Sequence, residues 1–394
     1  MTTTTMTMTT TTTMTMTATT ATATTGTTML LLRGLLLSML FAAACGDGAT
    51  AAPDAATAAP DAAPVAPDAA ALRDLLVEAA LDGNGLSTEV AFVVPSRTRS
   101  LTIVAEGDEA ALLALGSLVL ADGTDRVDLD LNRSWAAEMT ASYHDEQIGQ
   151  MPGSLYQSIR LGTFTQVYPN APGQALPAGP ASLRIASTAT NGNVTVRLLL
   201  PDEDEARTLA VNLVAVSDQF SFSGRPPFVD VMQTIFDQAG IAVVVRESSV
   251  LADSGLERIS TFSEPQEAPD SQAAELAGLG PQNGALNIFV VEGLPSGVGG
   301  LSLGTPGPPV QDSSYFGVLL LHSTSDALLG RVMAHEVAHF LALQHVTNRG
   351  ISGMSYADPL ADTEPGQGNL MENGTTLTPD QAYALSRSAL LTLP

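Results

Sequence analysis

Three of the five histidines in the chain, His335, His339 and His345, lie within an eleven-residue window. His335 and His339 are four residues apart, so on a helix their imidazoles share one face and can bind the same metal ion. A third imidazole from His345 completes a three-ligand site that leaves one coordination position of a catalytic zinc open to water. Glu336 stands beside the first ligand, where its carboxylate can take a proton from a metal-bound water. The spacing therefore predicts one catalytic zinc, with Glu336 as general base.

A helix that carries these residues must be held by its opposite face. Apolar residues that precede the first histidine predict that this face is buried: Leu328, Leu329, Val332 and Met333. Upstream, apolar runs predict buried strands at 209–216, 241–245, 285–291 and 316–321. Apolar residues at helical spacing predict a helix over 227–239, which ends at Gly240. Strands and helices in this order predict an α/β or α+β layer over one sheet.

At the histidines the sequence resembles the metzincin zinc endopeptidases, and in particular the pappalysin-like peptidases and related bacterial lipoproteins. The signature of that family is His-Glu-x-x-His-x-x-Gly-x-x-His, which runs here from His335 to His345. A methionine turn follows it in the family, and the candidate for it is Asn369, Leu370 and Met371. The resemblance covers 204–394. It implies a zinc metallopeptidase domain of the α+β, metzincin-like zincin class, in which a mixed sheet supports the active-site helix.

The same resemblance implies a protein or peptide substrate, whose peptide bonds are hydrolysed by a zinc-activated water. Met371 is then a structural floor beneath the metal and not a ligand. The stretch 377–386 resembles the closing helix of that fold, with Thr378 as its cap and Pro379 at its first position.

Two departures from the family pattern stand near the site. Ala342 occupies the position of the glycine that lets the helix end in a left-handed turn. Alanine can adopt that conformation at a cost of about 1 kcal/mol. No tyrosine stands directly after Met371, where some metzincins have one. Tyr356 and Tyr383 are interpreted as packing residues.

Three other groups lie close to the motif in sequence. His322 is interpreted as a polar surface residue. Asp358 and Asp362 lie between the last histidine and the methionine turn, where calcium binding is one interpretation and a solvated loop is the preferred one.

The N-terminal part of the chain predicts export. Residues 1–28 are a low-complexity tract of Thr, Met and Ala, and Met29 is an alternative start of the protein. Residues 29–45 resemble a lipoprotein-type signal peptide, with Arg33 before an apolar run and small residues before Cys45, the predicted lipid attachment site. An ordinary secretory signal with an incidental cysteine and a short membrane anchor are the alternatives. Residues 46–71, rich in Ala, Pro and Asp, predict an extended tether.

Residues 72–203 predict an all-β sandwich, because short strand-like runs alternate with clusters of Gly, Pro, Asn and Asp. These runs are 90–94, 100–104, 182–186 and 194–198. The segment 176–185 resembles the β-sandwich modules that accompany secreted bacterial peptidases. The acidic run 202–205 is interpreted as a solvated linker or turn before the second domain, with a loose cation contact as the alternative.

The net charge of the chain limits the classes of molecule that it can bind. Its 394 residues include 41 acidic and 16 basic ones, for a net charge of −25, and every basic residue is arginine. Such a chain repels nucleic acid and anionic lipid, so we expect contact with a membrane only through the N-terminal lipid anchor. The expected location is that of an exported bacterial lipoprotein, at the outer membrane or cell surface, with secretion as the alternative. A single cysteine excludes an intrachain disulfide.

Two other functions compete with a peptidase. In one, the helix carries incidental imidazoles and binds no metal. In the other, the chain is a catalytically silent surface lipoprotein of metzincin fold that acts as a binding or adhesion module. The intact Glu336 favours the enzyme, because a retired site has no need for the base, whereas Ala342 favours the silent module.

Overall fold

The computed structural model describes residues 73–127, 158–159, 161–252, 254–260, 271–295, 297–349, 355–358, 360–366 and 368–392. Within it Val65–Pro394 form one compact unit. The predicted division into 72–203 and 204–394 therefore stays a prediction. The low-complexity tract, the signal peptide with Cys45 and the tether lie outside the described residues, as does Leu72. No described helix is long and apolar enough to cross a membrane.

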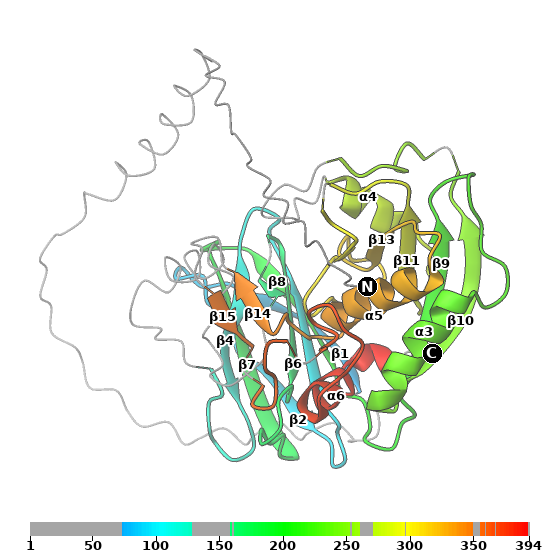
Figure 1. Cartoon of the computed structure of the whole chain (residues 1–394). Helices are drawn as coiled ribbons and strands as arrows, with labels where there is room; N and C mark the ends of the chain where they lie inside the picture. Colours follow the sequence, from blue (N-terminus) through cyan, green and yellow to red (C-terminus); the bar gives the residue numbers. More distant parts are fainter. Residues whose placement is uncertain are drawn as a thin grey trace, which may run out of the picture. The chain divides into compact units, whose positions relative to one another are not determined.

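The first part of the described chain is all β (Figure 1). Two antiparallel sheets form it, with strand orders β1-β8-β3-β6-β5 and β2-β7-β4. The strands are β1 (Asp74–Ala80), β2 (Val90–Val94), β3 (Leu101–Glu106), β4 (Leu113–Val119), β5 (Ser158–Ile159), β6 (Thr163–Tyr168), β7 (Gly179–Ser187) and β8 (Asn193–Leu199).

One hydrophobic core joins the two sheets, as in a β-sandwich. Alternation along β8 directs Val194, Val196 and Leu198 inward, and they meet Phe92 of β2 and Leu183 of β7 in this core. The four predicted strand runs are confirmed. Strands β1, β4 and β6 were not predicted. In β4 most side chains are buried on both faces, so its sequence lacks the polar alternation of a half-buried strand.

The second part is built on a mixed five-stranded sheet of order β10-β9-β11-β13-β12. The first four strands run parallel, and the short β12 lies antiparallel to β13 at one edge. The strands are β9 (Thr208–Ala215), β10 (Ala242–Val250), β11 (Leu286–Val291), β12 (Gly300–Ser302) and β13 (Val318–Leu321), with a separate pair β14 (Thr347–Arg349) and β15 (Ser355–Ala357). The four predicted strands and the mixed sheet are confirmed, whereas β12 was not predicted.

Helices cover both faces of this sheet (Figure 1). The helices are α3 (Pro227–Phe236), α4 (Gln272–Gly278), α5 (Asp326–Phe340) and α6 (Pro379–Leu385), with 3₁₀ turns η1 (Asp237–Ala239) and η2 (Ala389–Thr392). Helices α3, α5 and α6 share one core with the sheet, and α4 packs on the opposite face. Helices α3 and α5 touch at Gly330, where an added Cβ would lie 2.3 Å from the carbonyl oxygen of Phe228. The predicted helices over 227–239 and 377–386 are confirmed.

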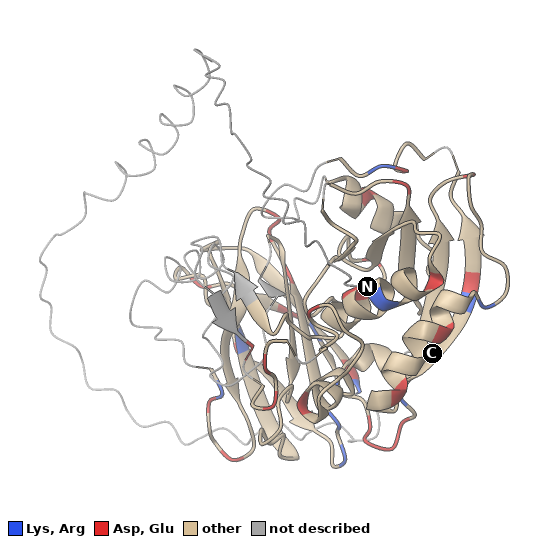
Figure 2. Ribbon diagram, viewed as in Figure 1, with Lys and Arg blue, Asp and Glu red and all other residues tan. Residues whose placement is uncertain are grey.

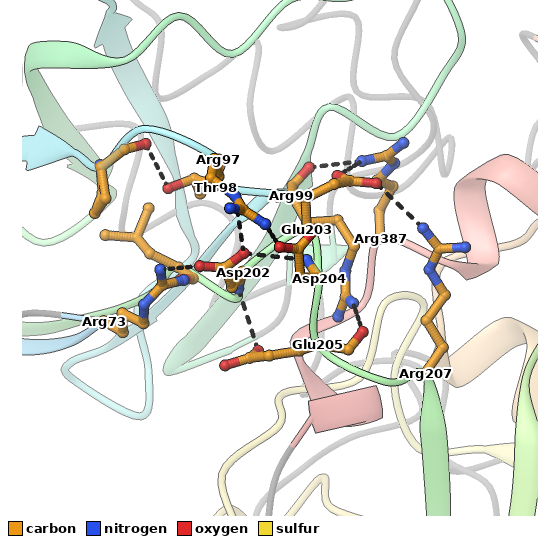
Figure 3. A network of polar contacts seen from close by, with 12 residues as sticks. Arg73, Arg97, Thr98, Arg99, Asp202, Glu203, Asp204, Glu205, Arg207 and Arg387 are labelled. Atoms are coloured by element: carbon orange, nitrogen blue, oxygen red, sulfur yellow. Dashed lines mark hydrogen bonds and ion pairs between the residues drawn. The ribbon is translucent and has the colours of Figure 1, made fainter.

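The acidic run 202–205 forms a largely exposed turn, in line with the prediction, and its side chains also take part in ion pairs. Asp202 pairs with Arg73, Asp204 pairs with Arg97, and Glu203 lies between Arg207 and Arg387 (Figure 3). Elsewhere in the described chain, Asp and Glu stand on many separate strands, helices and loops (Figure 2). The ion pairs with Arg73, Arg97 and Arg387 were not predicted, because these residues are distant from the run in sequence, which by itself shows only a series of like charges.

Candidate metal centre

Helix α5 presents the first two histidines. Its start is set by Ser325, whose hydroxyl accepts a hydrogen bond of 3.3 Å from the backbone N–H of Leu328. Met333, Val337 and Phe340 are fully buried in the core beneath the sheet, and this holds the helix by one face. His335 and His339 therefore point together from the opposite side of a rigid support, as the sequence predicted.

The end of α5 directs the chain towards the third histidine. The backbone N–H of Leu343 donates to the carbonyl of Ala338 at 2.8 Å, and that of Ala342 to His339 at 2.9 Å. This is the Schellman arrangement, which requires a positive φ at the residue that a glycine normally fills. Ala342 adopts it, with φ of 105°. The substitution of alanine for the family glycine thus leaves the left-handed turn in place.

The three imidazoles converge through their Nε2 atoms. Nε2 of His345 lies 3.1 Å from that of His335 and 3.2 Å from that of His339. Nitrogen ligands about 2.05 Å from a tetrahedral zinc stand about 3.3 Å apart, so the spacing fits a shared ion. Among the described residues, these three histidines form a group in which one ligand atom of each lies within 4.8 Å of the others. The residues present therefore fit a zinc ion.

Backbone carbonyls set the tautomers of two ligands. Nδ1 of His335 lies 2.7 Å from the carbonyl oxygen of Leu370, and Nδ1 of His339 lies 2.7 Å from that of Leu343. A carbonyl oxygen can only accept, so each Nδ1 carries the proton and each Nε2 keeps its lone pair for a metal. Sequence analysis missed both carbonyls, because backbone groups leave no mark in the residue types.

The electrostatics of the site also favour metal binding. Burial lowers the pKa of each of the three imidazoles, that of His345 to about 4 and that of His339 well below its usual value. The neighbouring imidazoles lower the pKa values of His339 and His345 further. All three are therefore neutral at pH 7, which is the form that coordinates a metal.

Glu336 is buried beside the edge strand β12. Its exposed fraction is 9%, and an added Cβ at Gly300 would lie 2.5 Å from its Cγ. Burial raises the pKa of Glu336 to about 8, against the hydrogen bond that its carboxylate accepts from the backbone N–H of Ser302. A cation held by the three histidines would favour the carboxylate form. Gly300 and Ser302 were not singled out from the sequence, since β12 itself was not predicted.

The methionine turn lies directly behind His335. Met371 is fully buried in the core, and its backbone N–H donates to Oδ1 of Asn369 at 2.8 Å. Asn369 in turn forms a reciprocal amide pair with Gln381 of α6, at 2.9 and 3.0 Å. Gln381 also completes a capping box with Thr378, a pattern visible in the sequence as Thr followed three residues later by Gln.

The remaining candidates lie away from the histidines or have other partners. Asp358 accepts hydrogen bonds from Leu360 and Thr363, and Asp362 accepts one from the backbone of Asp380. Oδ2 of Asp358 and Oδ1 of Asp362 are buried and have no partner among the described residues, so the calcium interpretation stays a prediction. Tyr383 lies under the guanidinium of Arg387, 4.1 Å from ring centroid to Cζ. His322 is exposed and stacks on Phe220 at 4.3 Å, in line with its interpretation as a surface residue.

Comparison with known proteins adds little to this geometry. No protein-family model and no curated protein matches the chain. Among solved structures, archaemetzincin from Methanopyrus kandleri is similar over 46% of this chain and 88% of its own, with 14% identity and a TM-score of 0.25. The structure of a chaperone-substrate complex is similar over 58% of this chain and 40% of its own, with 11% identity and a TM-score of 0.28. TM-scores of 0.25 and 0.28 do not support a functional inference, so the function is inferred from the geometry of the site alone.

Proposed function

We propose that the chain is a zinc-dependent endopeptidase of metzincin type, in which His335, His339 and His345 hold the ion. The observation that carries this proposal is the convergence of three neutral imidazoles next to a buried carboxylate. Nε2 of His345 lies 3.1 Å from Nε2 of His335 and 3.2 Å from Nε2 of His339. Zinc bound there supplies a Lewis acid that polarises a carbonyl and lowers the pKa of water.

Glu336 performs the proton transfer in this proposal. The carboxylate takes a proton from the attacking water and passes it to the leaving amine. Its neighbours favour that role, because the Ser302 N–H fixes its direction and the absence of a side chain at Gly300 leaves room for it. Met371 acts as a structural support behind His335 and binds no metal.

Strand β12 supports an extended peptide as substrate. It is one of the two edge strands of the mixed sheet, and among the described strands it pairs only with β13. Its free edge can pair with a peptide through backbone hydrogen bonds. The same strand packs on Glu336, so a peptide bound along it would lie close to the base.

We also propose that the protein is exported as a bacterial lipoprotein attached through Cys45 and displayed at the outer membrane or cell surface. This proposal rests on the signal-like sequence at 29–45 and on the tether at 46–71.

The test compares the protein with its Glu336→Gln variant and with a Glu275→Gln control, which removes an exposed carboxylate from α4. We expect one zinc per chain in all three by elemental analysis. Cleavage of a mixed peptide library should fall about 10²- to 10⁴-fold in Glu336→Gln only. Zinc without cleavage in every protein would favour the catalytically silent binding module, and the absence of zinc would refute the site.

A further inference from the structure

Arg99, two residues before β3, is a buried cation with few hydrogen-bond partners. Its exposed fraction is 1%. Nη1 donates to the carbonyl oxygen of Glu205 at 3.3 Å, a long hydrogen bond. Nε and Nη2 are buried and have no hydrogen-bond acceptor among the described residues. Several N–H donors of one guanidinium are thus without an acceptor from the chain.

Two more guanidinium groups lie nearby (Figure 3). Arg207 and Arg387 share one carboxylate, that of Glu203, at 3.2 and 3.1 Å. Nη1 of Arg387 also donates to the carbonyl of Arg99 at 2.9 Å. The Nε atoms of Arg207 and Arg387 are buried and, among the described residues, have no acceptor.

The charges of this cluster do not cancel through direct contacts. Glu203 is already shared by two arginines, and the carboxylate of Glu205 accepts from the backbone N–H of Asp202 at 3.2 Å. Burial and the charge of Arg207 lower the pKa of Arg99 to about 10, so the guanidinium remains protonated at neutral pH. A buried charge without a hydrogen-bonded counter-charge is strongly unfavourable. The charges of Glu203 and Glu205 act to raise the pKa of Arg99, but among the described residues neither carboxylate accepts a hydrogen bond from its guanidinium, so Arg99 lacks a hydrogen-bonded anion.

We propose that Arg99, Arg207 and Arg387 bind a chloride ion, which accepts hydrogen bonds from their unpaired N–H groups. A monatomic anion suits the near-complete enclosure of Arg99, and guanidinium groups lose little hydration energy when they bind an anion. The site joins the segment before β3, the 203–207 segment and Arg387, two residues after the end of α6. The bound chloride links these three segments. The free energy of unfolding therefore increases as the chloride site fills.

The experiment measures thermal unfolding in sodium chloride and in sodium gluconate at equal ionic strength. The protein is compared with Arg99→Met and Arg207→Gln, and with Arg197→Gln as control. Arg197 of β8 forms an ion pair at 2.6 Å with Asp74 of β1, outside the cluster. At a chloride concentration ten times the dissociation constant, the unfolding midpoint of the parent should rise by about 2 °C relative to gluconate.

The chloride-dependent shift should persist in Arg197→Gln and be lost in Arg99→Met, whatever the absolute midpoint of that variant. Arg207→Gln should reduce it, and this keeps the test valid if Arg99→Met does not fold. Crystals soaked in bromide should show an anomalous peak between the three guanidinium groups. Equal midpoints in chloride and gluconate, or an undiminished shift in both cluster variants, would overturn the proposal and leave ordered water as the partner of these donors.

Discussion

Replacing Gln381 by methionine should weaken both the fold and the metal site, because Gln381 connects α6 to the methionine turn. Its side chain is fully buried and bonds the amide of Asn369 in both directions, at 2.9 and 3.0 Å. It also accepts from the backbone N–H of Thr378 at 3.1 Å. Asn369 holds the turn that places the carbonyl of Leu370 against His335.

The expected cost follows from the groups that lose partners. Methionine is close to glutamine in volume and shape, so packing changes little. The Nδ2 group of Asn369, on a residue 1% exposed, and the N–H of Thr378 each lose an acceptor. An unsatisfied buried donor costs about 1–3 kcal/mol, so Gln381→Met should lower the free energy of unfolding by about 2–4 kcal/mol. A loosened Leu370 carbonyl should also weaken zinc binding about 10- to 100-fold.

Urea denaturation and competitive zinc titration measure the two effects. Gln238→Met is the matched control, because the exposed Gln238 bonds the backbone of the same loop, at Thr375 and Leu377. It should cost less than about 1 kcal/mol and leave zinc affinity unchanged. In a double-mutant cycle, Asn369→Leu combined with Gln381→Met should cost about 1–2 kcal/mol less than the sum of the single variants.

Three outcomes would refute this reasoning. They are a cost of Gln381→Met no larger than that of Gln238→Met, strict additivity in the cycle, and an unchanged zinc affinity in a clearly destabilised variant. The last result would show that the turn is structural only and does not position His335.

Other predictions concern the helix end, its packing and its titration. Ala342→Gly should change the free energy of unfolding by less than about 1 kcal/mol and keep zinc affinity, because relief of the positive φ offsets the lost methyl and the greater freedom of the unfolded chain. Ala342→Val should instead lose zinc, since a β-branched residue does not tolerate that φ; equal behaviour of the two in zinc titration would contradict this account. Gly330→Ala should cost about 1–3 kcal/mol in urea denaturation, because its Cβ would meet the Phe228 carbonyl at 2.3 Å; a neutral result would mean that α3 and α5 can separate freely. The folded pKa of His345, about 4, lies below its unfolded value of about 6.5, so the unfolded chain binds more protons between them. The metal-free protein should therefore lose stability as the pH falls through this window, and His345→Gln should lose less over the same urea titrations.

Much of the site was predictable because its geometry is local. The four-residue spacing of His335 and His339 places them on one helix face whatever the fold, and Glu336 comes with them. Apolar runs of strand length predicted the sheet that supports α5, because a strand buried on both faces appears in the sequence as a nearly continuous apolar run. The cap at Thr378 was equally local. The predictions that fall before residue 73, including Cys45, lie outside the described residues and remain predictions from sequence.

Only the tertiary structure decided the features that depend on contacts between distant residues. The approach of His345 to the other ligands depends on the positive φ of Ala342. The residue type alanine does not by itself indicate a positive φ. The carbonyl of Leu370 reaches His335 across 35 residues, and β12 encloses Glu336 through a short strand without periodicity. The acidic run 202–205 became part of an arginine network for the same reason. Sequence periodicity reports which residues share a face of one element, whereas pairing between elements depends on how the whole chain packs.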